Sequence, residues 1–147
     1  MYTEPLNVNS LNEQSSLSDK NQPYNGLKRY AVVKRAQVSI NSIWAERIID
    51  ERIKFYCMHP GWVTTPGLEL HMPTFSRYLR LLLRNLDQGI DTLLWLISSS
   101  ESSLTSSGDF WHDRKIRTSH RLKSTKVAET NDERTKLWNF CVEKMNY

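Results

Sequence analysis

The stretch RYAVVKRAQVSINSIWAE, residues 29–46, decides the fold of this chain. It contains neither glycine nor proline, and its apolar side chains recur every three or four residues at Val33, Ala36, Ile40 and Ile43. That spacing is typical of an amphipathic helix, which we predict over residues 28–51.

Tyr30 and Lys34 lie one turn apart on the same face of this predicted helix. An ammonium group favours the phenolate form, so Lys34 would lower the pKa of the Tyr30 phenol, which starts near about 10. The ordinary alternative is a surface tyrosine beside a solvated lysine. Tyr24 and Lys28 repeat the spacing, but the Asn25-Gly26 pair between them predicts a turn.

The Tyr30 phenol needs more than Lys34 to become a proton-transfer group near neutral pH. Lowering its pKa to about 7 requires roughly 4 kcal/mol. An ammonium about 4 Å away supplies roughly 1 kcal/mol in water and roughly 4 kcal/mol at an effective dielectric constant of about 20. We therefore expect a partly enclosed site.

A short apolar run, residues 54–59, follows the helix and stops at Pro60-Gly61, which predicts a buried strand ending at a turn. A long helix followed by a buried strand is typical of a parallel α/β fold. Ligands of such folds lie at the carboxyl ends of the strands, here at residues 59–67.

The Tyr-x-x-x-Lys helix, the short strand and then Pro60-Gly61-x-Val63-x-Thr65 resemble the second half of a short-chain dehydrogenase/reductase. The resemblance covers most of the chain from Tyr30 onward. It implies an α/β fold, the carboxyl-terminal half of a Rossmann-type doubly wound parallel sheet. It also implies hydride transfer between NAD or NADP and a carbonyl or alcohol substrate.

The resemblance assigns roles residue by residue. Tyr30 would be the general acid/base, and Lys34 would lower its pKa and bind the nicotinamide ribose. The nicotinamide carboxamide would be held by Pro60, Gly61, Val63 and Thr65. The family's catalytic serine would be Ser16 or Ser18, or would lie upstream of this chain.

The glycine-rich turn that holds the pyrophosphate in this family has no counterpart, since none of the five glycines fits its spacing. We expect residues 1–27 to be a polar loop segment and residues 28–147 to be the carboxyl-terminal part of an incomplete domain. The amino-terminal half would be missing, and the chain alone would be inactive. A full-length form could be a homo-oligomer.

Further elements follow from the remaining pattern. Residues 75–84 predict a helix, which the resemblance makes a lid over the substrate, and residues 86–97 predict a helix packed on the sheet. Residues 109–112 resemble a last parallel strand, residues 114–126 predict a solvated basic loop, and Thr130 to Glu133 form a capping-box pattern before a final helix. That helix should direct five side chains to the core: Leu137, Trp138, Cys141, Val142 and Met145.

Composition bounds the partners. The 147 residues carry a net charge of +4, which permits anionic partners. The alternative function is therefore a non-catalytic remnant that binds a protein partner or an anionic membrane surface through residues 77–84 or 114–126. We expect no nucleic-acid partner, because no recognition motif accompanies the basic run.

Cysteine, histidine and hydropathy patterns add further expectations. The two cysteines, Cys57 and Cys141, match no metal or redox spacing, and we expect no disulfide. No metal site is expected from His59, His71, His112 and His120. The start resembles no secretory signal and no apolar run could span a membrane, so we expect an intracellular, cytoplasmic protein.

Overall fold

The computed structural model describes residues 2–12, 24–100 and 106–145 of this mixed α/β chain. The chain divides into two compact units. Unit 1 comprises Met1–Phe55 and Thr118–Tyr147, and unit 2 comprises Tyr56–Arg117. Each unit is described by itself.

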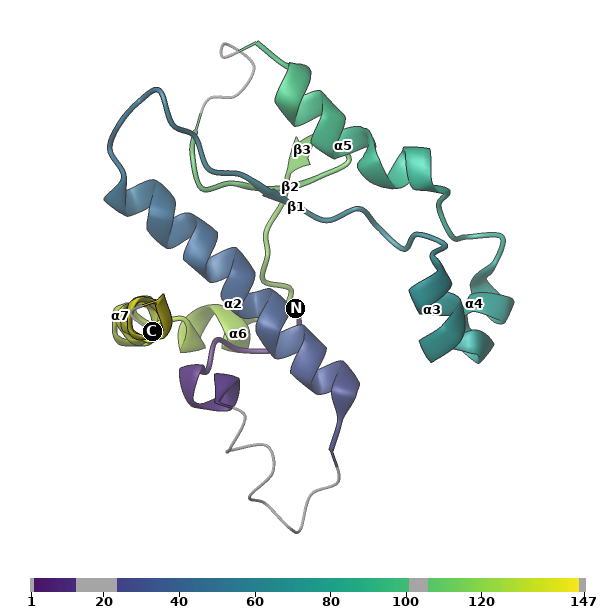
Figure 1. Ribbon diagram of the computed structural model, residues 1–147, viewed down its shortest axis with the longest axis horizontal. Helices are drawn as coiled ribbons and strands as arrows, with labels where there is room; N and C mark the ends of the chain where they lie inside the picture. The colour runs from purple at the N-terminus through teal and green to yellow at the C-terminus, as the bar shows by residue number, and fades with distance from the viewer. Residues whose placement is uncertain (1, 13–23, 101–105, 146–147) are drawn as a thin grey trace. The chain divides into compact units, whose positions relative to one another are not determined.

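Unit 1 is built around the long helix α2, Gly26–Arg47, which packs against the final helix and a short 3-10 helix (Figure 1). Its other elements are η1 (Val8–Leu11), α6 (Lys123–Ala128) and α7 (Asn131–Met145). The long helix was predicted, and its presence is confirmed.

The ends of α2 differ from the prediction of 28–51. Asn25, predicted to lie in a turn, is the N-cap, and its side-chain oxygen accepts a hydrogen bond from the Lys28 N–H at 3.0 Å. The helix ends at Arg47 because Ile48 is extended, although the Ile48 N–H still donates to the Trp44 carbonyl. Tyr24 precedes the helix, so it shares no helix face with Lys28.

Apolar side chains from η1, α2, α7 and the chain just before η1 form the core of unit 1. Its buried members are Leu6, Val8, Ala36, Ile43 and Leu137. Two of them come from the segment 1–27 that was expected to be a polar loop. Thr130 caps α7 as predicted, since its hydroxyl accepts from the Glu133 N–H at 3.2 Å. Met145, predicted to face the core, is 73% exposed, and Phe140 packs against the core instead.

Within the described residues of unit 2, three strands form one mixed sheet in the order β1-β2-β3. They are β1 (Cys57–Met58), β2 (Phe110–His112) and β3 (Lys115–Ile116). The first two are parallel, with Cys57 opposite Phe110 and Met58 opposite Trp111. Both predicted strands are present but shorter than expected.

The strand β3 corrects the prediction of a basic loop over 114–126. It pairs antiparallel with β2, so Trp111 lies opposite Ile116 and the chain turns back at Asp113 and Arg114. The same stretch later forms α6, where Thr125 is buried. The basic side chains at 115, 117, 121, 123 and 126 are nevertheless exposed, as predicted.

The helix predicted over 75–84 is also wrong in its bounds. Only residues 75–79 of this range are helical, in α4 (Pro73–Leu79), which follows another short helix, α3 (Pro66–His71). The carbonyl of Leu79 then accepts hydrogen bonds from the N–H groups of Leu82 and Leu83, which turns the chain. Arg84 consequently lies outside any helix, in a parallel bridge with Val63.

Helix α5, Leu86–Ser98, was predicted almost to the residue, but its packing was not. The residues expected to face the sheet are mostly exposed: Leu86, Ile90, Leu93, Leu94 and Ile97. Its buried positions are Gly89 and Thr92, and the Trp95 ring lies 5.3 Å from the Trp111 ring. Strands of two or three residues are too short to cover so wide an apolar face.

Candidate active site

Tyr30 and Lys34, the residues predicted to act as a catalytic pair, lie next to each other on α2. The Lys34 Nζ lies 5.6 Å from the centroid of the Tyr30 ring. Tyr30 is 63% exposed, so the phenol of the chain as described faces a water-like dielectric rather than an enclosed site. The pair places a proton donor, the Tyr30 hydroxyl, beside the Lys34 cation. A ligand or chain segment that covered Tyr30 would exclude water from the pair.

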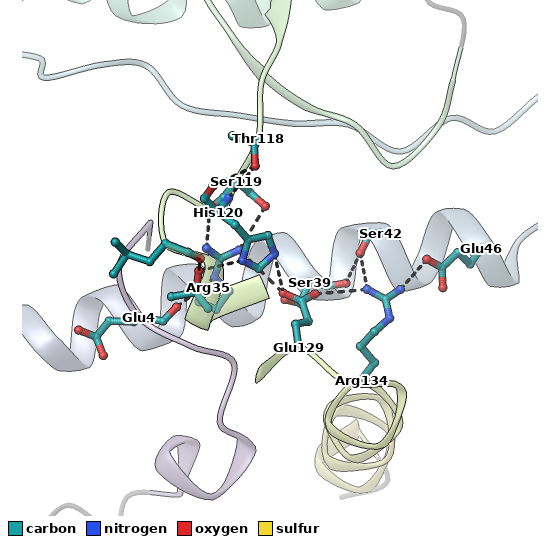
Figure 2. A network of polar contacts seen from close by, with 12 residues as sticks. Glu4, Arg35, Ser39, Ser42, Glu46, Thr118, Ser119, His120, Glu129 and Arg134 are labelled. Carbon is teal, nitrogen blue, oxygen red and sulfur yellow. Dashed lines mark hydrogen bonds and ion pairs between the residues drawn. The ribbon is translucent and has the colours of Figure 1, made fainter. Parts of the chain in front are cut away.

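Arg35, the residue after Lys34, is fully buried. Its side chain lies in a network of polar contacts (Figure 2). Its Nε donates to the Glu4 carbonyl at 3.3 Å, and its Nη1 donates to the Ser119 hydroxyl at 3.2 Å. Its guanidinium also lies 3.9 Å from the Glu129 carboxylate. Burial lowers the Arg35 pKa, and the nearby Glu129 charge opposes that effect.

The same network reaches α7 through Glu129 (Figure 2). The Glu129 carboxylate lies 3.2 Å from His120 Nε2 and 3.3 Å from Arg134 Nη1. Arg134 also donates to the Ser42 hydroxyl at 3.0 Å and forms an ion pair with Glu46 at 2.6 Å. The network fixes α2, and with it the backbone that carries Tyr30 and Lys34, to the rest of unit 1.

The segment Pro60 to Thr65 follows β1 and forms a defined turn in unit 2. Gly61 has a φ of +81°, a backbone conformation that glycine adopts without strain. Its N–H donates to His59 Nδ1 at 2.9 Å, so the His59 ring must carry no proton on Nδ1. Burial lowers the His59 pKa, and the neighbouring His112 and Arg84 lower it further. The lowered pKa favours the neutral ring.

The predicted binding residues after Gly61 are held from both sides. Val63 lies in the parallel bridge with Arg84, where the Thr64 N–H donates to the Arg84 carbonyl at 2.9 Å. Thr65 caps α3, because its hydroxyl oxygen accepts from the Leu68 N–H at 3.2 Å. The Thr65 hydroxyl proton can still donate to a ligand.

The structure thus places Tyr30 and Lys34 together in unit 1, and it places Pro60, Gly61, Val63 and Thr65 together in unit 2. Ser16 and Ser18 lie outside the described residues. Both cysteines are free, and burial raises the pKa of the Cys57 thiol to about 11. The described parts of the chain hold no cluster of histidine, cysteine and acidic side chains that could bind a metal.

Sequence reasoning missed the residues that support these side chains. Arg35 interrupts the buried face of α2 three residues after Val32, and a charge at such a position signals a buried partner. Arg84 and Asp113 gave no comparable signal, because their pairing depends on a turn and a hairpin that the sequence did not predict.

The sequence of this chain is similar to those of two mammalian proteins. No protein-family model matches it. It is 38% identical over 130 residues to "Dehydrogenase/reductase SDR family member 12" of Bos taurus, covering 88% of this chain and 40% of that protein. It is 36% identical over 133 residues to the Homo sapiens protein of the same name, covering 90% of this chain and 39% of that protein.

Every helix in the described residues is too short or too polar to cross a membrane.

The chain spans about two-fifths of the length of the curated relatives that it matches. About nine-tenths of the chain matches part of a short-chain dehydrogenase/reductase, which confirms the resemblance that its sequence predicts.

Proposed function

We propose that this chain is the carboxyl-terminal part of an oxidoreductase that transfers hydride between NAD or NADP and a carbonyl or alcohol substrate. The observation that carries the proposal is the pair on α2, with Lys34 Nζ 5.6 Å from the Tyr30 ring. The turn from Pro60 to Thr65 supports it, because these residues lie directly after a strand of a sheet with parallel pairing.

The chemistry assigned to the chain's own residues is proton transfer. The bound nicotinamide would give or accept the hydride. Tyr30 Oη would donate a proton to the substrate oxygen when a carbonyl is reduced, and would accept it when an alcohol is oxidised. Lys34 would stabilise the phenolate that forms on donation.

The chain alone lacks two parts of this machinery. Tyr30 is 63% exposed, whereas proton transfer by this pair near neutral pH requires a partly enclosed site of lower dielectric constant. The glycine-rich pyrophosphate turn also has no counterpart in the 147 residues. We therefore propose that a longer polypeptide encloses Tyr30, binds the cofactor and is the active form.

The test is a chimera in which this chain replaces the matched residues of the human relative. Oxidation of NADH and NADPH would be followed with a panel of aldehydes and ketones. Tyr30→Phe should abolish turnover and leave folding unchanged. Tyr24→Phe is the matched control, because it removes the same hydroxyl from the other Tyr-x-x-x-Lys motif and should change nothing. Retained turnover in Tyr30→Phe would contradict the assignment.

A second candidate function is binding to an anionic membrane surface. The observation that favours it is the turn after α4, where Leu81 is 98% exposed and Leu82 is 77% exposed, close in sequence to Arg77 and Arg80. Exposed leucines beside arginines suit a membrane surface, because the leucines can enter the acyl-chain region while the arginines contact anionic headgroups. The other basic stretch is less suited, since Arg114 is paired with Asp91 and Thr125 is buried.

Vesicles separate this candidate from the enzyme. Binding to phosphatidylserine vesicles should fall with added salt and should be lost in Leu81→Ser/Leu82→Ser. Ile49→Ser is the matched control, since Ile49 is 89% exposed and lies in the other unit. Binding that is equal in both variants would dismiss this surface, and Tyr30→Phe should have no effect on it.

A further inference from the structure

The turn from Pro60 to Val63 is held by Arg84 through both its backbone and its side chain. The Arg84 N–H donates to the Trp62 carbonyl at 2.8 Å, and the Arg84 carbonyl accepts from the Thr64 N–H at 2.9 Å. Its guanidinium donates to the Pro60 carbonyl at 3.3 Å. A Cβ on Gly61 would lie 2.7 Å from Arg84 Nε, so any other residue here would displace the Arg84 side chain, and the φ of +81° also favours glycine.

The Arg84 guanidinium is in turn fixed by Asp113 at the tip of the β2-β3 hairpin. The two side chains form a forked pair, with Nη1 to Oδ1 at 2.6 Å and Nη2 to Oδ2 at 2.9 Å. Such a pair fixes the plane of the guanidinium as well as its position. Arg84 therefore reaches the Pro60 carbonyl in one orientation.

The hairpin tip is anchored on its other side to α5. Asp113 and Arg114 both have a φ of 55°, a conformation that costs a non-glycine residue energy and persists only where the surroundings hold it. The Arg114 N–H donates to the Thr92 hydroxyl at 3.2 Å, and its Nε donates to the Asp91 carboxylate at 2.8 Å. The tip thus bridges α5 and the turn after β1.

Helix α5 also touches that turn directly. A Cβ on Gly89 would lie 2.7 Å from the Val63 Cγ2, so glycine allows the helix to pack onto Val63. Val63 is therefore bounded by the Arg84 backbone and by α5, while Arg84 itself is locked by the hairpin.

We propose that Arg84 and Asp113 are positioning residues for the nicotinamide, acting through the backbone of the turn from Pro60 to Thr65. The proposal rests on the proposed function, because it takes the nicotinamide carboxamide as the ligand of that turn. The hairpin tip and α5 fix the backbone conformation of the turn before any cofactor binds. The forked Arg84–Asp113 pair connects the hairpin tip to the turn.

The first measurement needs no cofactor. Amide hydrogen exchange of the 147-residue chain would be compared for the native sequence, Asp113→Asn and Asp113→Glu. Asparagine tolerates the positive φ, so Asp113→Asn removes the charge without straining the backbone. We expect exchange at Thr64 to rise about 5-fold in Asp113→Asn, which corresponds to about 1 kcal/mol, the upper end for an ion pair whose side chains are 30% and 48% exposed. Exchange in α7 should stay unchanged.

Arg52→Gln is the matched control, since Arg52 forms a forked pair with Asp50 in the other unit. It should leave exchange at Thr64 unchanged, and Asp113→Glu should keep most of the protection. Unchanged exchange at Thr64 in Asp113→Asn would overturn the inference, whatever the cofactor does.

The second measurement uses the chimera described above. In Asp113→Asn we expect kcat to fall about 10-fold and the KM for the cofactor to rise, with recovery in Asp113→Glu. Faster exchange with unaltered kcat and KM would show that the pair holds the turn but does not position the nicotinamide, and would overturn the proposal. A native chimera that turns over no substrate would instead refute the proposed function, and the positioning of a nicotinamide with it.

Discussion

Replacing Arg35 with methionine should destabilise unit 1 strongly. The side chain has no solvent exposure and makes polar contacts with Glu4, Ser119 and Glu129. Methionine keeps much of the volume but removes every donor, so it leaves buried acceptors without this partner.

The magnitude follows from what remains after the change. Removing one partner of a buried ion pair costs about 3–5 kcal/mol. Glu129 keeps Arg134 at 3.3 Å and His120 at 3.2 Å, so its charge is not left alone and the lower end applies. We expect a loss of about 3 kcal/mol, a large part of the roughly 5–15 kcal/mol that stabilises a typical domain.

Hydrogen exchange of the slowest amides in α2 and α7 would measure this free energy for unit 1 alone. Arg52→Met is the control, because the Arg52 side chain is 88% exposed and its loss should leave those amides unchanged. Arg35→Met/Glu129→Gln should cost less than the sum of the two single changes. A loss below about 1 kcal/mol for Arg35→Met would refute the view that this network fixes α2.

Three further predictions concern unit 2. The lowered His59 pKa means that the unfolded state binds a proton at a higher pH than the folded state does, so stability should fall as pH drops below about 6.5. Amide exchange at Gly61, corrected for intrinsic rates, should then become faster. Protection that does not depend on pH would contradict this. Gly89→Ala should cost about 1–3 kcal/mol in urea unfolding, since its Cβ would meet Val63 at 2.7 Å, whereas Gly67→Ala, with open space around it, should not. A Cys57 pKa of about 11 predicts alkylation by iodoacetamide at neutral pH that is roughly 100-fold slower than for a thiol of pKa about 9; equal rates for Cys57 and a small-peptide thiol would disprove its burial.

The sequence predicts the elements of this chain better than their packing. The long helix around Tyr30, the helix over residues 86–97 and the two predicted strands are confirmed, because each has a period or a flanking turn signal of its own. The parallel pairing of the two strands, which the family resemblance implied, is also present. The strand β3 escaped prediction because its two residues carry no such signal and its turn uses Asp113 and Arg114 at positive φ instead of glycine.

The candidate site shows the same division. Tyr30 and Lys34 were predicted from their spacing on a helix, and the turn from Pro60 to Thr65 from the strand before it, together with the family resemblance; their roles stay predictions. Arg84 was placed on a helix that in fact ends at Leu79. Its side chain contacts residues 24 and 29 positions away along the chain, and no local pattern encodes such contacts.

The most direct test of the central claim compares hydride transfer by the 147-residue chain and by the chimera under the same conditions. The account predicts that the chimera oxidises NADH or NADPH in the presence of a carbonyl substrate. It also predicts that the chain alone is no faster than its Tyr30→Phe variant. Turnover by the chain alone that depends on Tyr30, or a chimera inert with both cofactors, would contradict it.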